Sequence, residues 1–430
     1  MSTPRKVVII GGGFAGLACA QELANDSRFE VTLLDRSNHH LFQPLLYQVA
    51  TASLAAPDIA RSLRGILTRA KNITVLLDEI TGIDPDAKVV RSKDHTYPYD
   101  DLVLAMGAVN SYFGNDHWAE HSIGLKTLAE AQEIRARVLN SLETAERSEN
   151  EEECKRLMTI AIVGGGPTGV ELAGAFSDLV RLALKSDFRR IDPKQLRIIL
   201  IQSGDRILRP FDPEHSDYAH TRLEELGVEI RLGARVDEIE HERLHLTTGE
   251  WIEAATIIWA AGVQANPLTS SLDSPRDRAG RLEVSPDLSL PKYPHIFAAG
   301  DLALVNDAKG NPVPGLAPAA AQMGKHIAKL LKEDLRLSTT RYAERREEFR
   351  PSFKYRDKGI MAIIGKNCAV AQAGDTKMKG LIAWMAWLLI HLLFLVGFRN
   401  KLSVLLQWAW AYVVDKPGAR VISQEGQKEP

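Results

Sequence analysis

Two glycine-rich turns, 153 residues apart (164 − 11), are the segments of this chain best suited to chemistry. The first reads Gly-Gly-Gly-Phe-Ala-Gly at residues 11–16, and the second reads Gly-Gly-Gly-Pro-Thr-Gly at residues 164–169. Each follows an apolar strand and opens a helix, the Gly-x-Gly-x-x-Gly arrangement that brings backbone N–H groups to a pyrophosphate. One such turn is weak evidence. Two predict two dinucleotides in one enzyme, most simply a flavin and a nicotinamide.

A carboxylate follows the second turn closely. Glu171 lies two positions beyond Gly169, close to where a nicotinamide would meet a flavin. The dipole at a helix N-terminus lowers the pKa of such a carboxyl group, whereas a polyanionic cofactor nearby raises it. Capping of the helix is one role that such a carboxylate can have.

The elements around the first turn repeat a strand–helix–strand order. A helix is expected at residues 17–24 and a second strand at residues 29–34, which ends at Asp35. Asp35 lies 19 residues after Gly16, a spacing suited to hydrogen bonds from an adenosine ribose. A turn carboxylate at the surface is the alternative. Further strands are expected at residues 73–76, 79–80, 101–107 and 295–301, with a helix at 318–331.

The unit that contains the second turn extends from residue 159 to about 262, and it differs from the first unit at one position. Its strand at residues 197–201 ends at Gln202 instead of an acid. An acid at this place bonds the ribose 2′-hydroxyl of NADH and repels the 2′-phosphate of NADPH. Glutamine removes the repulsion, so we predict that NADPH is accepted alongside NADH or preferred to it.

These elements predict an α/β fold with two Rossmann-like dinucleotide-binding domains and a C-terminal membrane-associated helical region. The expected domains are a discontinuous flavin domain at 1–112 and 285–335, a nicotinamide domain at 113–284, and a C-terminal domain at 336–430 whose amphipathic helices occupy about 379–414.

The C-terminal region contains two apolar runs. Leu381 to Phe398 gives eighteen positions (398 − 381 + 1) without formal charge, and residues 402–414 form the second run. Four of the seven tryptophans lie between residues 384 and 410, and basic residues flank both runs. Because tryptophan and snorkelling cations favour the membrane interface, we expect helices lying on one leaflet. A true span and a buried core or dimer helix pair stay open.

Composition excludes several other classes. The net charge of −2 argues against nucleic-acid binding. Cys19, Cys154 and Cys368 are far apart, which fits a reducing compartment and gives neither a zinc-binding spacing nor a Cys-x-x-Cys pair. No metal is expected. The first strand starts within ten residues of Met1, so we expect no signal or transit peptide.

The chain resembles the type II NADH dehydrogenases, which are single-subunit NAD(P)H:quinone oxidoreductases that do not pump protons. The resemblance covers nearly the whole chain. It rests on five motifs and the tryptophan-rich C-terminus: Gly-Gly-Gly-Phe-Ala-Gly-Leu at 11–17, Pro-Leu-Leu-Tyr-Gln-Val-Ala at 44–50, Gly-Gly-Gly-Pro-Thr-Gly-Val-Glu-Leu-Ala-Gly at 164–174, Trp-Ala-Ala-Gly-Val at 259–263 and Ala-Ala-Gly-Asp at 298–301.

The resemblance implies a tightly bound FAD in the first fold, NADH or NADPH on the second, and a quinone from the membrane. For FAD it implies contacts at Gly11, Gly12, Gly13, Phe14, Ala15, Gly16, Asp35, Arg36, Ile80, Gly107, Asp301, Ala317 and Pro318. For the nicotinamide nucleotide it implies Gly164, Gly166, Thr168, Gly169, Gln202, Ala261 and Gly262. It also places Glu171 beside the flavin, so we expect Glu171 to position substrate or relay protons, with capping of the helix as the alternative.

The family's quinone motif is Ala-Gln-x-Ala-x-Gln, and this chain departs from it. Residues 317–322 keep the second glutamine, Gln322, but have Pro318 at the first. Gln322 is then the candidate donor to a quinone carbonyl, or else a buried structural glutamine. Lys379 is a candidate for the quinone entrance, or else an interfacial cation. The resemblance further implies a homodimer, peripheral on the cytoplasmic face of a bacterial cell membrane.

Rival functions in the same fold depend on cysteine chemistry. Disulfide reductases, peroxide-reducing flavoenzymes and sulfide:quinone oxidoreductases need reactive cysteines near the flavin, and residues 39–50 contain none. We therefore expect the three cysteines to be structural or incidental. A non-catalytic redox protein similar to apoptosis-inducing factor is the remaining alternative, and turnover with a soluble quinone analogue distinguishes it.

Overall fold

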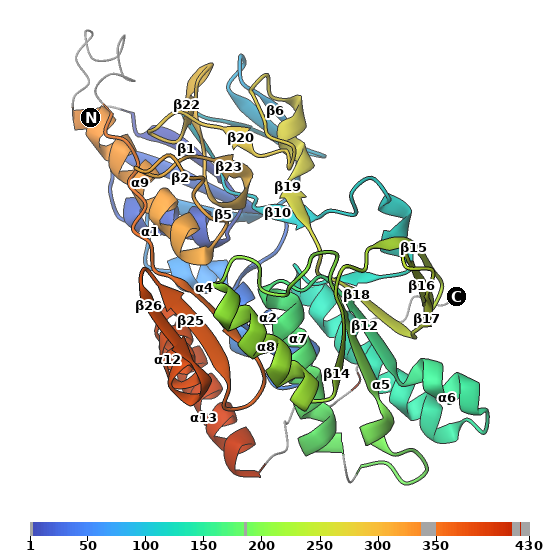
Figure 1. Ribbon diagram of the computed structural model, residues 1–430. Coiled ribbons are helices and arrows are strands. Elements are labelled where there is room, and N and C mark those ends of the chain that lie inside the picture. The colour runs from blue at the N-terminus through green and yellow to red at the C-terminus, as the bar shows by residue number, and fades with distance from the viewer. Residues whose placement is uncertain (1–2, 185–186, 337–349, 415–421, 423–430) are drawn as a thin grey trace. The chain divides into compact units, whose positions relative to one another are not determined.

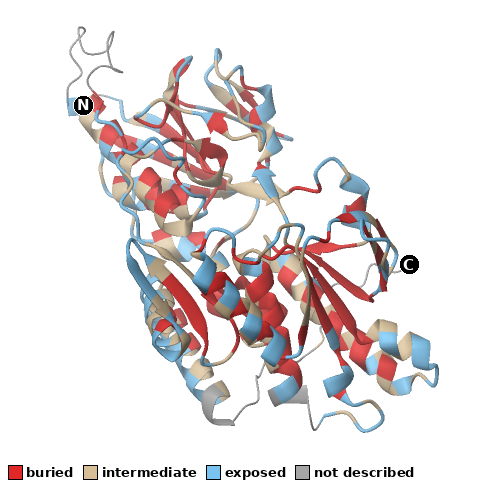
Figure 2. Cartoon of the chain, viewed as in Figure 1, coloured by how far each residue is buried: buried red, intermediate tan, exposed pale blue. Residues whose placement is uncertain are grey.

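The computed structural model describes residues 3–184, 187–336, 350–414 and 422 (Figure 1). The central strands of its two main sheets are short, apolar and largely buried (Figure 2). In β12 (Thr159–Val163) every residue is buried, and in β1 (Arg5–Ile10) the last four are. Continuous burial of this kind is typical of parallel strands covered on both faces.

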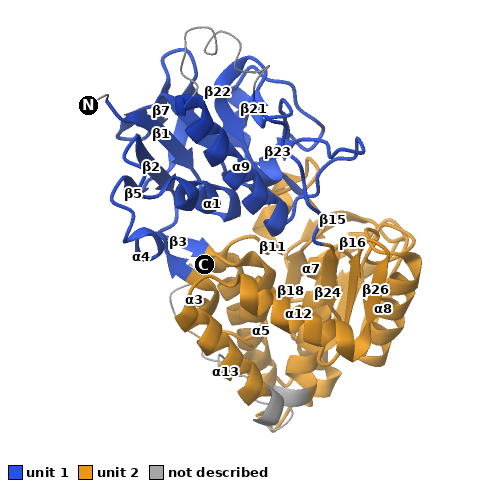
Figure 3. Ribbon diagram, turned by 90° about the vertical axis from the view of Figure 1, so that its left-hand side faces the viewer, with its two compact units in different colours: residues 1–40, 61–109, 263–358 blue, residues 41–60, 110–262, 359–430 orange. Residues whose placement is uncertain are grey.

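The chain forms two compact units (Figure 3). Unit 1 contains residues 1–40, 61–109 and 263–358, and unit 2 contains residues 41–60, 110–262 and 359–430. The segment after residue 358 thus belongs to the unit that carries the second glycine turn. The three domain boundaries expected from the sequence stay a prediction.

Unit 1 is organised around a six-stranded sheet in the order β21-β22-β9-β1-β2-β5. All neighbours are parallel except β21 and β22. The first turn follows β1 at the centre of this sheet. The remaining bounds are β2 (Phe29–Asp35), β5 (Ile73–Leu77), β9 (Asp101–Leu104), β21 (Ser289–Leu290) and β22 (Tyr293–Ala298).

Two helices of unit 1 lie against each other beside the first turn, α1 (Phe14–Leu23) and α9 (Ala317–Arg336). A Cβ atom on Gly324 of α9 would stand 2.0 Å from the carbonyl oxygen of Ala15. Only glycine therefore allows α9 to approach α1 so closely. A separate antiparallel sheet of unit 1 is formed by β6 (Ile80–Asp84), β7 (Val89–Ser92) and β8 (Thr96–Pro98).

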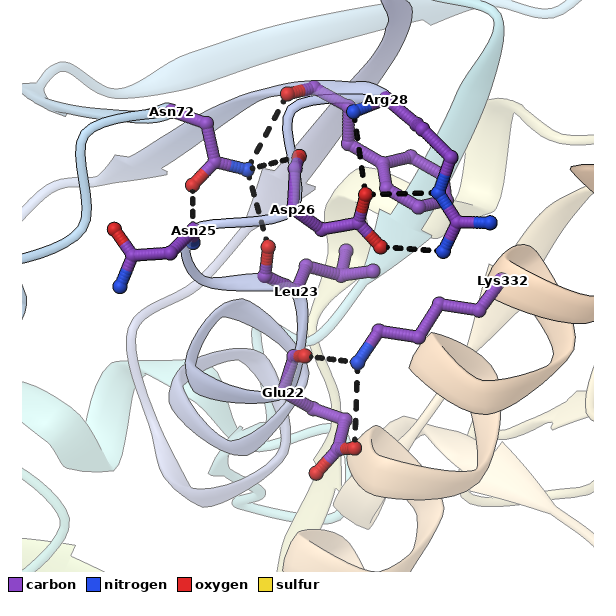
Figure 4. Close-up of polar contacts among 8 residues, drawn as sticks. Glu22, Leu23, Asn25, Asp26, Arg28, Asn72 and Lys332 are labelled. Carbon is purple, nitrogen blue, oxygen red and sulfur yellow. Dashed lines mark hydrogen bonds and ion pairs between the residues drawn. The ribbon is translucent and has the colours of Figure 1, made fainter.

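The turn between α1 and β2 is fixed by side chains from outside it (Figure 4). The Asn72 amide donates to the backbone carbonyls of Leu23, Asp26 and Phe29, and its oxygen accepts from the backbone N–H of Asn25. Lys332 of α9 donates to the carbonyl of Glu22 in the last turn of α1. These bonds satisfy backbone groups that the helix end leaves free, and they fix where β2 starts and hence where Asp35 lies.

Unit 2 contains a five-stranded, fully parallel sheet in the order β11-β18-β12-β13-β14. The second turn follows β12 at its centre, as the first follows β1. The other bounds are β11 (Ile123–Gly124), β13 (Arg197–Ile201), β14 (Val228–Arg231), β18 (Thr256–Trp259), α5 (Leu128–Arg147), α6 (Glu151–Leu157), α7 (Pro167–Asp178), α8 (Pro213–Glu225), β15 (Val236–Glu240), β16 (Arg243–Leu246) and β17 (Trp251–Glu253).

Unit 2 also contains the C-terminal elements. An antiparallel sheet of β24 (Ile360–Ile363), β25 (Ala369–Ala373) and β26 (Thr376–Lys379) leads into α12 (Gly380–Phe394) and α13 (Phe398–Val414). The helix formed by the first apolar run, α12, ends at Phe394, before the run itself ends at Phe398. Among the described residues, none of the helices has the length and apolar character needed to cross a bilayer.

One side of α13 is hydrogen-bonded to α3 (Ala56–Ile59). The buried carboxylate of Asp58 accepts from Ser403 and Gln407, at 2.7 Å each. Asn400 donates to the backbone carbonyls of Pro57 and Asp58. Large apolar side chains elsewhere on the two helices are exposed: Leu381, Ile382, Met385, Leu389, Ile390, Leu393, Phe394, Phe398, Leu402, Leu405, Leu406 and Trp410.

Candidate active site

The first glycine turn has the geometry of a phosphate loop. Gly11 adopts a φ of +101°, which L side chains rarely take. A Cβ on Gly16 would lie 1.8 Å from the carbonyl oxygen of Gly11, so the helix can approach the strand only with glycine there. A Cβ on Gly13, by contrast, would meet no atom within 4 Å. The backbone at Gly13 therefore faces open space, as needed for a pyrophosphate.

The second turn repeats each of these features. Gly164 has a φ of +114°, and a Cβ on Gly169 would lie 1.9 Å from the carbonyl oxygen of Gly164. A Cβ on Gly166 would again meet nothing within 4 Å, and Thr168 is exposed beside it. Two turns with one geometry, each at the N-terminus of a helix, fit two dinucleotides.

Asp35 and Gln202 occupy equivalent places in the two units. The Asp35 carboxylate accepts from the backbone N–H of Gly12 at 2.5 Å and from that of Ser37 at 2.6 Å. The Oε1 atom of Gln202 accepts from the backbone N–H of Gly165 at 2.9 Å. Asp35 is the last residue of β2 and Gln202 directly follows β13, and each side chain bonds the middle glycine of its turn. Gln202 in unit 2 therefore occupies the place that Asp35 has in unit 1.

The remaining residues expected at FAD all lie in unit 1. Ala317 and Pro318 are the first two residues of α9, Gly107 has a φ of +68°, and Arg36 is exposed. Ile80 is buried in the core, and Asp301 follows β22, with its carboxylate 3.2 Å from the place of a Cβ on Gly315. In unit 2, Ala261 and Gly262 follow β18, and Ala261 lies against the turn at Gly164.

His40 belongs to the first turn but was not singled out from the sequence. Its ring is 2% exposed, and Nδ1 lies 3.0 Å from the carbonyl oxygen of Gly12. Since a carbonyl can only accept, Nδ1 carries the hydrogen and Nε2 carries the lone pair. Burial lowers the pKa of His40, which keeps the ring neutral, and Nε2 has no partner among the described residues. An unpaired buried acceptor beside this turn fits a hydroxyl-bearing ligand such as a dinucleotide.

Glu171 is the fifth residue of α7 and is partly buried. Its Oε1 atom accepts from the backbone N–H of Ile363 in β24, at 3.5 Å. The N-cap of α7 is Gly166, and no side chain caps it, so Glu171 does not have the alternative capping role. Burial raises the pKa of Glu171 to about 8, which outweighs the lowering expected from the helix dipole. Glu171 is therefore mostly protonated at neutral pH and can donate a proton.

Tyr47 is the second group of this region that the sequence did not identify. It is buried, and its hydroxyl oxygen accepts from the side-chain amide of Gln48 at 2.9 Å. Burial and, second, the charge of Glu171 raise the pKa of Tyr47. The ring of Trp387 in α12 lies 6.4 Å from the Tyr47 ring, and its buried indole nitrogen has no partner in the described parts of the chain. The signal in the sequence that could have identified Tyr47 is its place in the Pro-Leu-Leu-Tyr-Gln motif.

The two residues expected at the quinone already have partners. The Gln322 amide nitrogen donates to the backbone carbonyls of Pro318 and Arg356, at 3.2 and 3.1 Å, and its oxygen accepts from the Arg356 N–H at 3.0 Å. A quinone carbonyl would have to displace one of these acceptors. Lys379 forms an ion pair with Glu214 at 2.7 Å and lies over the Tyr218 ring.

The cysteines do not form a redox pair. All three are free thiols. Cys19 is buried, and burial raises its pKa to about 12, so it stays protonated at physiological pH. Burial also raises the pKa of Cys368, whose sulfur lies 3.4 Å from the Tyr218 hydroxyl. No cluster of metal-binding side chains occurs within the described ranges.

The pairing of two phosphate loops on two parallel sheets defines a two-dinucleotide flavoprotein fold, and comparisons with known proteins agree. The pyridine nucleotide-disulphide oxidoreductase family model matches residues 5–324. The type II NADH:quinone oxidoreductase Ndh of Mycobacterium tuberculosis is 40% identical over 98% of this chain and 90% of its own length. The mitochondrial internal alternative NAD(P)H-ubiquinone oxidoreductase A1 of Arabidopsis thaliana is 29% identical over 97% of this chain and 86% of its own.

Solved structures show the same fold. NDH2 from Plasmodium falciparum in complex with NADH aligns with a TM-score of 0.87 at 20% identity, over 96% of this chain and 99% of that one. The sulfide:quinone oxidoreductase from Aquifex aeolicus aligns with a TM-score of 0.71 at 20% identity, over 92% of both chains. The chain belongs to the pyridine nucleotide-disulphide oxidoreductases and, within them, to the type II NADH:quinone oxidoreductases.

Two alanine substitutions in the second turn should separate ligand binding from folding. Gly166→Ala places a methyl group in open space, so we expect a normal melting temperature and a KM for NADH raised roughly tenfold. Gly169→Ala drives a methyl group into the Gly164 carbonyl, so we expect unfolding to become easier by about 1–3 kcal/mol. Thermal melts and steady-state kinetics measure both effects. Equal changes in KM and stability for the two variants would contradict this assignment.

Proposed function

We propose that this chain oxidises NADH and NADPH through a tightly bound FAD and reduces a membrane quinone to quinol without pumping protons. Membership of the type II NADH:quinone oxidoreductases supports the flavin, the NADH and the quinone. The observation that carries the proposal is the repeated geometry of the two turns, with open space at Gly13 and at Gly166. FAD as the particular flavin, and NADPH as a second donor, are supported by Asp35 and Gln202 respectively.

The residues of the chain bind and orient the nucleotides. Bound FAD supplies the hydride acceptor and passes on the electrons. The helix N-termini after Gly13 and Gly166 hold the pyrophosphates, because their free N–H groups and the helix dipole favour anions. Asp35 is proposed to accept from the adenosine ribose of FAD, and the lone pair of His40 to accept from a hydroxyl group of the same cofactor.

Proton supply is the part of the reaction that we assign to Glu171. Reduction of a quinone to a quinol consumes two protons as well as two electrons. Glu171 holds a proton at neutral pH because burial raises its pKa to about 8. Tyr47 lies close enough to Glu171 for a charge on the carboxyl group to raise the pKa of the Tyr47 hydroxyl, after burial as the larger cause. Gln322 and Lys379 are also proposed to contact the quinone. To do so, Gln322 must release one of its backbone partners and Lys379 must release Glu214.

The exposed apolar side chains of α12 and α13 support attachment to a lipid surface. The proposed arrangement is peripheral, on the cytoplasmic face of the membrane, with the helices lying in the interface. A lipid-soluble acceptor then reaches the enzyme without leaving the membrane. A homodimer through these helices is part of the proposal and is tested by the mass of the detergent-solubilised protein.

Cysteine-dependent quinone reduction is the second candidate, and only the fold of the Aquifex protein favours it. Cys19 stays protonated, and the three sulfurs are unpaired. The test is oxidation of NADH, NADPH and sulfide by the membrane-reconstituted protein, with ubiquinone and menaquinone as acceptors. We expect turnover with both nucleotides and none with sulfide. Turnover with sulfide alone, or with nothing, would contradict the proposal.

Substitution of Gln202 should change the preference of the enzyme between NADPH and NADH. Gln202→Glu restores a negative charge beside Gly165, so we expect kcat/KM for NADPH to fall roughly tenfold or more, with kcat/KM for NADH retained. The measurement is the ratio of the two kcat/KM values, with one quinone held saturating. A wild-type enzyme that uses NADH exclusively would refute the role of Gln202.

A further inference from the structure

The chain just before Phe113 is fastened to the end of β18. The backbone N–H of Ser111 donates to the carbonyl of Gly262 at 3.1 Å, and the indole N–H of Trp259 donates to the carbonyl of Ser111 at 2.8 Å. The buried ring of Tyr112 stacks on Trp259, with 5.3 Å between the ring centroids. These three contacts fix the place from which the Phe113 side chain projects.

Phe113 combines an unfavourable backbone conformation with an exposed ring. Its φ is +54°, in the left-handed region, which costs an aromatic residue free energy and persists only where the surroundings enforce it. The side chain is nevertheless 62% exposed, so it contributes little to the core. Burial of the ring therefore does not account for the strain. Strained residues of this kind gather at sites that bind ligands.

One side of the Phe113 ring lies on the backbone of Gly262. A Cβ atom on Gly262 would stand 2.5 Å from Cζ of the ring and 3.1 Å from each Cε atom, so a larger residue there would push the ring aside. The ring also meets Trp259 edge-on, with 6.2 Å between the centroids. The ring is thus supported from one side, and its exposed side is free to contact a ligand.

The order of the strands decides which half of a dinucleotide reaches Phe113. The second turn follows β12, with β13 on one side of this strand and β18 on the other. In folds of this kind the residue after the second strand bonds the adenosine ribose, and here that residue is Gln202 after β13. With the adenosine on that side and the pyrophosphate at Gly166, the nicotinamide half extends toward β18, where Gly262 and Phe113 lie.

We propose that the exposed side of the Phe113 ring is the surface on which the nicotinamide half of NADH packs. The inference rests on the proposed function, since it needs NADH to bind the second turn. A flat apolar ring suits a nicotinamide ring and its ribose. Because Gly262 and Trp259 hold the Phe113 ring in place before the nucleotide arrives, less freedom is lost on binding. Phe113 is then a substrate-binding residue that ligands without the nicotinamide half do not use.

The test compares ligands that contain the nicotinamide half with ligands that lack it. We expect Phe113→Ala to raise the KM for NADH roughly tenfold, and to leave the inhibition constants of 5′-AMP and ADP within about twofold of the wild type. Phe113→Tyr keeps the ring and should keep the wild-type KM. Trp251→Ala is the matched control, because Trp251 is a 44% exposed aromatic residue in the separate antiparallel sheet of unit 2, and the KM for NADH should not change.

A glycine variant separates binding from folding. Phe113→Gly removes the same ring as Phe113→Ala, but glycine takes the left-handed conformation without steric cost. The glycine variant should therefore melt at a higher temperature than the alanine variant and have the same raised KM for NADH. A KM that returns toward the wild-type value as the melting temperature rises would show that Phe113 acts only through folding, which would overturn the inference.

The remaining outcomes separate this inference from the function it rests on. If Phe113→Ala keeps the wild-type KM for NADH, the ring does not contact the nucleotide and the inference is wrong. It is equally wrong if the binding of 5′-AMP and ADP weakens as much as that of NADH. In both cases oxidation of NADH by the wild type still stands. If the wild-type protein oxidises no nucleotide at all, the proposed function itself fails.

Discussion

Replacement of Glu171 by glutamine should lower the rate of quinone reduction roughly 100-fold at neutral pH, within the usual range for loss of a general acid. It should also remove the pH dependence near pH 8. Glutamine keeps the size and one acceptor of the side chain but cannot release a proton. The bond from the Ile363 N–H can persist, so we expect normal flavin content.

The sign of the pH effect follows from the raised pKa. Burial moves the pKa of Glu171 from its usual 4.5 to about 8, so the proton is present below pH 8 and lost above it. Wild-type quinone reduction should therefore fall as pH rises through about 8. Because the folded protein holds this proton more tightly than the unfolded chain, the free energy of unfolding should also decline with rising pH from about 4.5 to 8. The glutamine variant should lack this decline.

Asp178 provides the control on the same helix. It accepts from the backbone N–H of Lys366, and burial raises its pKa to about 6. Asp178→Asn should thus alter stability at lower pH and leave the quinone profile near pH 8 intact. The role of Glu171 would be disproved by a Glu171→Gln enzyme with full flavin and unchanged quinone reduction from pH 6 to 9.

The second large effect concerns the membrane. A triple variant in which glutamate replaces Ile382, Phe398 and Leu406 should partition into lipid vesicles at least 1000-fold less than the wild type. The free energy of partition should lose on the order of 2 kcal/mol for each apolar side chain removed from lipid. These side chains are 70, 80 and 60% exposed, so they contribute little to the core. The rate with a water-soluble quinone should persist while the rate with a long-chain quinone in vesicles falls. Vesicle co-sedimentation measures the binding.

The matched control uses apolar residues exposed outside these two helices. Leu77 and Val263 are 61 and 47% exposed, and glutamate at both should not affect vesicle binding. Melting curves should be similar for all variants. If the triple variant still sediments with vesicles as the wild type does, another surface of the protein binds the membrane.

The strands and turns were predictable because their signals are local. The apolar residues of β1 and β12 followed by glycines specify buried parallel strands and phosphate turns, and the helices begin and end near the expected residues. The place of Gln202 at the end of the strand at residues 197–201 was also predicted from the sequence. Each signal depends on a few neighbours in sequence, and the structure confirms the elements they predicted.

The properties that depend on distant segments were not predictable. The sequence left the direction of the pKa shift of Glu171 open, because the helix dipole lowers the pKa and a polyanionic cofactor raises it. In the structure, α7 packs against β24, and the burial of Glu171 raises its pKa. Likewise, the partners of Gln322 and Lys379 lie 34 and 165 residues away in sequence, at Arg356 and Glu214. Nothing in the local pattern at residues 317–322 or 377–381 indicates these contacts.

The most direct measurement is anaerobic rapid mixing of the purified protein, first with NADH and then with a benzoquinone or naphthoquinone, followed by flavin absorbance. We predict that one equivalent of NADH bleaches the flavin and that one equivalent of quinone restores the colour, and that the second step slows above pH 8. A colourless protein would contradict the account. So would a flavin that NADH bleaches and no quinone re-oxidises.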